Sequence, residues 1–139
     1  MKKILSFFLV VSLLNFLFIG CGKNSFTVYI QLQCDEEIYA VHVEYYIGET
    51  AIGGTEASLT PEKDVAFESG ATVSFAFSAE DFPQDAQIKD FRFEVYLLLA
   101  DGNEIVAASL GIAACYGESY HYSLYGNEEE GFRLQRGGE

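Results

Sequence analysis

Tryptophan is absent from the sequence, and proline, methionine and cysteine occur only two, one and three times. Basic residues are also scarce: eight lysines and arginines stand against 21 aspartates and glutamates, for a net charge of −13. A chain this acidic is repelled by phosphate backbones, so we exclude nucleic-acid binding. The missing tryptophan removes the widest flat face for stacking on sugars, which weakens a sugar-binding interpretation.

Sequence signatures of catalysis are missing as well. The chain has no Gly-x-Ser-x-Gly turn. Cys115 and His121 could form a nucleophile and its base, but Cys115 follows the apolar run Ile112–Ala114. Such a setting raises the pKa of a thiol and suppresses its reactivity. We therefore expect neither an enzyme nor a cofactor.

The first 20 residues have the layout of an export signal. Lys2 and Lys3 precede an apolar run over 4–19, and Gly20 and Cys21 follow it. The run is 16 residues long, which is shorter than the roughly 20 residues that a membrane-spanning helix needs. A positive start before a short apolar run is typical of a secretory signal peptide, so we expect the rest of the chain to be exported.

The end of this leader, Leu17–Cys21, resembles the lipobox of bacterial lipoproteins, in which a small residue directly precedes a cysteine. The sequence departs from the family at Phe18, where leucine is usual. The resemblance implies that the Cys21 thiol is diacylglycerated and that cleavage before it makes Cys21 the mature N-terminus. It also implies attachment to the outer side of the cell membrane, since several acyl chains give stable anchoring.

The remainder of the chain reads as one β-rich domain. Apolar residues alternate with polar ones, as in Phe26–Leu32, which is the pattern of half-buried strands. We expect one helical turn after Ser78, crossing between sheets. The expected strands cover 26–33, 38–47, 50–57, 65–67, 72–78, 91–100, 104–112, 118–125 and 131–136.

Short strands at regular spacing predict a single antiparallel β-sandwich over 26–136, after a tether at 21–25 and before a frayed tail at 137–139. The sandwich is immunoglobulin-like by analogy only, because the buried tryptophan of true immunoglobulin domains is missing. A small closed β-barrel is the alternative.

Two cysteines and two histidines are candidates for bonds that cross the fold. Cys34 and Cys115 form either an extracytoplasmic disulfide or two buried free thiols. His42 and Glu44 share one strand face, and His121 shares another with Ser123 and Tyr125. If the two strands were neighbours, His42, Glu44 and His121 could hold a metal; a solvated outer sheet face is the alternative.

Four tyrosines near the C-terminus form a candidate binding surface. Tyrosine supplies amphipathic contact area that interfaces favour, although its ring serves a core equally well. These residues are Tyr116, Tyr120, Tyr122 and Tyr125.

The sequence therefore predicts a membrane-anchored, extracytoplasmic and non-catalytic interaction module. Only Gly22–Ser25 separate Cys21 from the first expected strand, and they reach about 14 Å at ~3.5 Å per residue. We therefore expect the domain to stay close to the membrane. Its partners would be the membrane, through the lipid, and an unidentified protein or small molecule nearby. The alternative is a lipoprotein that binds a small ligand or a metal.

Overall fold

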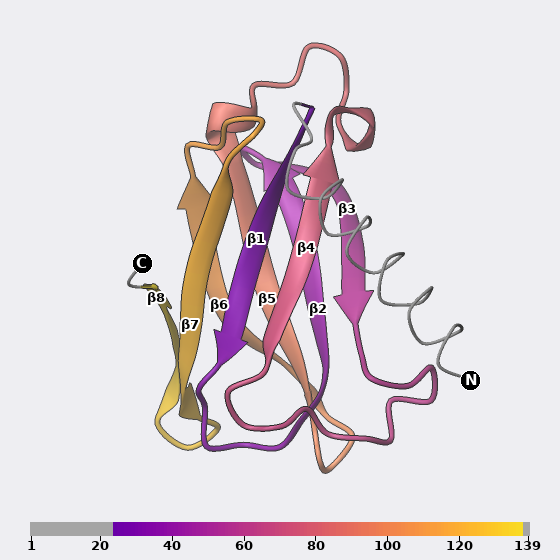
Figure 1. The fold of residues 1–139 in the computed structure, drawn as a ribbon, viewed down its shortest axis with the longest axis vertical. Helices are drawn as coiled ribbons and strands as arrows, with labels where there is room; N and C mark the ends of the chain where they lie inside the picture. Colours follow the sequence, from indigo (N-terminus) through magenta and orange to yellow (C-terminus); the bar gives the residue numbers. More distant parts are fainter. Residues whose placement is uncertain (1–23, 138–139) are drawn as a thin grey trace, which may run out of the picture.

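The computed structural model describes residues 24–137, which form eight strands in two facing sheets (Figure 1). Sheet A has the order β4-β1-β7-β8 and sheet B the order β3-β2-β5-β6. The two sheets stay separate, so the predicted β-sandwich is confirmed and the closed barrel is wrong. The strands are β1 Ser25–Leu32, β2 Ile38–Ile47, β3 Thr50–Ala57, β4 Thr72–Ser78, β5 Phe91–Leu99, β6 Glu104–Ile112, β7 Ser119–Asn127 and β8 Gly131–Arg136.

One strand pair departs from the predicted antiparallel arrangement. β1 and β7 run parallel in the middle of sheet A, with Thr27 opposite Ser119 and Leu32 opposite Leu124. All other paired strands are antiparallel. Because β1 and β7 share one direction, their first residues, Ser25 and Ser119, lie at the same end of the sandwich.

The core lies between the sheets and follows from the period-two pattern. Along β5, every second residue from Phe91 to Leu99 is buried, and the residues between them are only partly buried. Aromatic rings fill the end nearest Ser25: the Phe26 ring lies 4.9 Å from Phe91 and 5.3 Å from Phe77. Each such ring, fully buried, contributes roughly 1.5–3 kcal/mol.

The crossover from sheet A to sheet B begins with the predicted helical turn. Ser78 donates its backbone N–H to Asp81 Oδ2 at 2.8 Å and opens a short 3-10 helix, η1, over Ala79–Asp81. A second one, η2, covers Ile88–Asp90 directly before β5.

The short strand expected over 65–67 does not form. Phe67 makes one backbone hydrogen bond, to the Ile38 oxygen at 2.8 Å, and its ring packs on the core. A single bond does not make a ladder, so the segment remains a loop.

The predicted leader, the lipidation site Cys21 and most of the 21–25 tether lie outside the described residues, as does the tail after Gly137. Within 24–137 no helix is long and apolar enough to cross a bilayer.

Candidate ligand-binding face

The two cysteines lie at opposite ends of the sandwich. Cys34 follows the end of β1, whereas Cys115 precedes the start of β7. The stretch of β1 from Thr27 to Leu32 alone spans about 17 Å, far beyond the roughly 4.4–6.8 Å between the Cα atoms of a disulfide. Both thiols are free, so the disulfide alternative is wrong. Of the alternative with two buried free thiols, Cys34 is buried as expected, whereas Cys115 is exposed.

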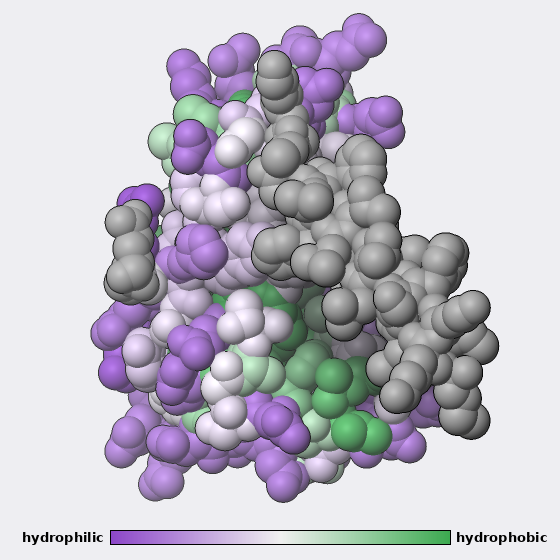
Figure 2. Space-filling model, viewed as in Figure 1, coloured by the Kyte–Doolittle hydropathy of each residue, from purple (hydrophilic) through white to green (hydrophobic). Residues whose placement is uncertain are grey.

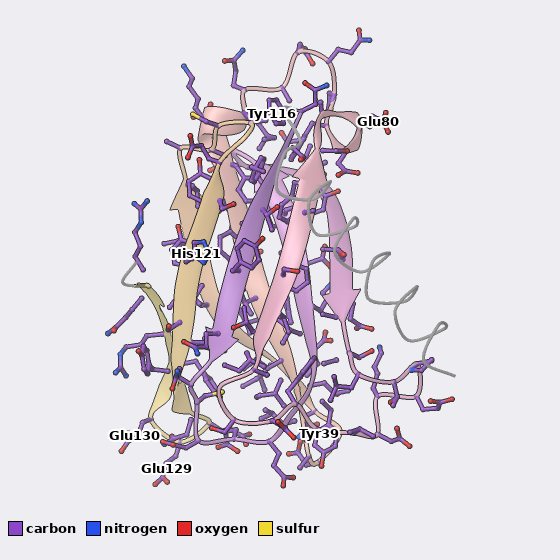
Figure 3. All side chains as sticks on the ribbon, viewed as in Figure 1. Tyr39, Glu80, Tyr116, His121, Glu129 and Glu130 are labelled. Atoms are coloured by element: carbon purple, nitrogen blue, oxygen red, sulfur yellow. The ribbon has the colours of Figure 1, made fainter. Side chains whose placement is uncertain are left out.

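The predicted metal ligands also point in opposite directions. His42 and Glu44 lie on the outer side of β2 in sheet B, where His42 Nε2 and Glu44 Oε1 are 2.8 Å apart. His121 lies on the outer side of β7 in sheet A, with its ring 4.7 Å from that of Tyr29 (Figure 3). The full thickness of the sandwich separates them, so this metal site is wrong. Residues 24–137 contain no other group of His, Cys, Asp and Glu suited to a metal.

Three of the four candidate tyrosines turn inward. Tyr116 and Tyr120 each pack 6.2 Å from the Phe26 ring. Tyr122 is buried against Phe93, and desolvation raises the pKa of its phenol. The four tyrosines therefore do not form one surface: Tyr122 is buried, Tyr116 and Tyr120 are partly buried against the core, and only Tyr125 lies on an outer sheet face.

The outer side of sheet A carries no carboxylate among the described residues. This surface is called the sheet A face below. Its centre is mostly pale in Figure 2, whereas strongly hydrophilic residues gather at the two ends of the sandwich. By strand alternation and register, it consists of Thr72, Ser74 and Ala76 of β4, Thr27, Tyr29 and Gln31 of β1, Ser119, His121, Ser123 and Tyr125 of β7, and Arg133 and Gln135 of β8.

The outer side of sheet B is charged by contrast. Glu44 lies directly opposite Glu94, an arrangement of like charges that is normally unfavourable. Neighbouring side chains contact both: His42 Nε2 lies 2.8 Å from Glu44 Oε1, and Arg92 Nη1 lies 3.7 Å from Glu94 Oε1. Arg92 also lies over the Tyr46 ring at 4.1 Å. Glu44, Glu94 and Arg92 thus already have partners within the domain.

A hollow of about 380 Å³ opens in the sheet A face. The parallel rings of Tyr29 and His121, only 6° from coplanar orientation, form one wall. Gln31 lines it too, and its Nε2 donates to the Gly70 oxygen at 3.3 Å, which orients the amide. The lining contains no Asp, Glu, Lys or Arg.

Ser123 lies in the lining of this hollow and is unusual. The residue is only 9% exposed, yet its hydroxyl makes no hydrogen bond to any of the residues 24–137. No side-chain nitrogen or oxygen atom of the described residues is both buried and without a partner, so this hydroxyl is accessible from the hollow. Sequence reasoning placed Ser123 on a face with His121 but gave no sign that its hydroxyl would be unpaired.

A second hollow, of about 340 Å³, lies at the end far from Ser25. Leu32, Ile38 and Phe67 contribute apolar groups, and four carboxylates surround them. Two of these carboxylates hold loops: Glu36 accepts from the Glu128 N–H at 3.0 Å, and Glu37 accepts from the Tyr39 hydroxyl at 3.0 Å. The hydrogen bonds of Glu36 and Glu37 therefore stabilise the turns at the lower end of the domain in Figure 3.

No protein-family model matches the chain, and no curated protein matches it. Among solved structures, the chain is similar to a protein from Eubacterium rectale studied by NMR, at 9% identity and a TM-score of 0.48, over 84% of this chain and 92% of that one. It is also similar to the membrane-binding domain of pneumolysin, at 8% identity and a TM-score of 0.42, over 83% and 97%. Likenesses this distant carry no argument about function.

Proposed function

We propose that the protein is a lipid-anchored, extracytoplasmic binding module that presents its sheet A face to a partner near the membrane. The anchor rests on residues 1–21, whose end resembles a lipobox with Cys21 as the acylated residue. The choice of face rests on one observation, the lack of carboxylates over the whole outer side of sheet A.

This lack is informative because the chain is so acidic. With 21 acidic residues in 139, a sheet face of a dozen positions without one is a local departure from the rest of the surface. Interface centres are depleted in charged residues and enriched in tyrosine, and this face has Tyr29 and Tyr125. A partner that meets this face avoids the desolvation of carboxylates that the sheet B face would impose.

The anchor and the face are compatible in geometry. Ser25 starts β1 in the middle of sheet A, only a few residues after the predicted lipidated Cys21. The end with η1 and η2 would thus be nearest the anchor, and acidic residues lie at both ends, with Glu80 at this one and Glu129 and Glu130 at the far one (Figure 3). Anionic headgroups repel the acidic domain, while the acyl chains hold it at the membrane.

Two measurements test this function. Mass spectrometry of the mature protein should find Cys21 as an acylated N-terminus, and an unmodified or uncleaved terminus would contradict the anchor. The purified lipoprotein should bind isolated cell envelopes of the source bacterium, and Tyr29→Ala should weaken that binding. Tyr96→Ala is the matched control, because Tyr96 is a partly buried tyrosine on the sheet B face. Equal effects of both substitutions would contradict the assignment of the face.

A further inference from the structure

We propose that the hollow in the sheet A face is a carbohydrate site that takes a neutral sugar. The Ser123 hydroxyl is its free hydrogen-bonding group, and the Tyr29–His121 pair is its aromatic wall. This inference rests on the proposed function, since it names the ligand class for the same face.

The charge of the lining selects for a neutral ligand. No Asp, Glu, Lys or Arg side chain lines the hollow. An anion placed there would lose water without gaining a cation, and an ammonium group would find no carboxylate. The nearest cation on the face, Arg133, has its guanidinium 5.3 Å from the Tyr125 ring, and it is not part of the lining.

Ser123 provides the strongest sign that a ligand belongs there. The residue as a whole is only 9% exposed and lines the hollow, and its hydroxyl has no hydrogen-bond partner among residues 24–137. Because none of the side-chain nitrogen or oxygen atoms of these residues is both buried and unpartnered, the hydroxyl is accessible from the hollow. A serine hydroxyl both donates and accepts, and a sugar hydroxyl does the same. A sugar in the hollow would therefore satisfy a group that the domain leaves unpaired.

The other lining groups suit both the polar hydroxyl groups and the apolar C–H face of a sugar. Gln31 keeps its amide nitrogen on the Gly70 oxygen, so its carbonyl oxygen remains an acceptor for a sugar hydroxyl. The aromatic rings of Tyr29, His121 and Tyr125 suit the apolar C–H side of a sugar ring. These rings take the place of the tryptophan that the sequence lacks.

The size of the hollow limits the ligand to a small one. At about 380 Å³ it lies near the lower end of the roughly 300–1,000 Å³ range of ligand pockets. One or two sugar units fit this range, whereas a longer chain would extend across the exposed Thr72 and Ser74 of β4.

The test uses the full-length lipoprotein in detergent micelles and titrates it with neutral disaccharides: cellobiose, maltose, lactose and chitobiose. Glucuronate and glucosamine serve as charged counterparts. Binding is followed by NMR of the His121 and tyrosine rings. We expect saturable shifts with at least one neutral sugar and weaker responses to both charged ones.

Ser123→Ala should weaken the binding of that sugar about five- to tenfold, the loss expected for one hydrogen bond. Because the hydroxyl has no partner within the domain, the same variant should unfold at the same urea concentration as the parent. Ser74→Ala is the matched control: Ser74 is an exposed serine on the same face outside the hollow, so its loss should not change affinity.

Two results would overturn the inference: no saturable shift with any neutral sugar, or unchanged affinity in Ser123→Ala. Tighter binding of the charged sugars would overturn its neutral-ligand part. These failures are distinguishable from failure of the proposed function. If Tyr29→Ala weakens envelope binding while no sugar binds, the face stands and the ligand class is wrong. If Tyr29→Ala leaves envelope binding intact, the face itself is wrong.

Discussion

Replacing Gly126 with alanine should destabilise the domain more than any other glycine substitution in the β7–β8 hairpin. Gly126 has φ of +110°, a conformation that costs an L-residue about 1–3 kcal/mol. A Cβ there would overlap the Gly131 carbonyl oxygen and lie 3.0 Å from Phe132 Cα. Both are backbone atoms, so the hairpin itself must move, at a further cost of about 1–3 kcal/mol.

Together these terms give about 2–6 kcal/mol, against a total stability of about 5–15 kcal/mol for a domain of this kind. Gly131→Ala is the control, because Gly131 also has positive φ, +91°, but has open space at its Cβ position. Urea unfolding followed by tyrosine fluorescence measures both, since no tryptophan masks the signal. Equal destabilisation by the two substitutions would refute the steric part of this reasoning.

Phe91→Ala should lower the free energy of unfolding in urea by about 3–5 kcal/mol, because the Phe91 ring is fully buried among other aromatic rings. Val106→Ala is the control, and because Val106 is 58% exposed it should change that free energy by less than about 0.5 kcal/mol. Burial raises the pKa of the Cys34 thiol, so its contribution to the free energy of unfolding should be fully present below the ordinary thiol pKa of about 8.5 and should be lost as the pH rises above that value. In Cys34→Ala, the first part of this loss of stability with pH should disappear. A pH profile of stability identical to that of the parent would contradict the assignment. A thiol reagent should modify exposed Cys115 in the folded protein and Cys34 only after unfolding, and equal rates in native buffer would contradict their placement.

Much of the fold could be predicted from the sequence because period-two alternation is a local signal. Phe91–Leu99 shows it: one face of the strand is entirely apolar, so only one orientation buries it. The strands expected over 91–100 and 104–112 form as well, and Gly102 in the turn between them has φ of +84°. The prediction of a strand over 65–67 was wrong because two alternating apolar residues are too few to require a ladder of backbone hydrogen bonds.

The site was less predictable, since alternation says which residues share a face but not which strands are neighbours. His42 and His121 satisfied the composition of a metal site, yet their strands belong to different sheets. Tyr120 and Tyr122 satisfied the composition of an interface, yet both face the core. The parallel pairing of β1 with β7, which brings Tyr29 beside His121, joins segments about 90 residues apart and leaves no local trace.

The proposed sugar site rests on features of the sheet A face that composition alone cannot show. The missing tryptophan counted against it, but a stack of Tyr29 on His121 is formed across two strands and is invisible to a residue count. The unpaired hydroxyl of Ser123 arises in the same way, from the packing of β7 between β1 and β8.

Site-specific photocrosslinking in living cells tests the central claim most directly. A photoreactive amino acid is placed at Thr72, at the edge of the sheet A hollow, or at Val106, on the outer side of sheet B, in the full-length lipoprotein. Illumination should give a discrete crosslinked product from position 72 and none from position 106. Products from position 106 alone, or equal products from both, would contradict the account.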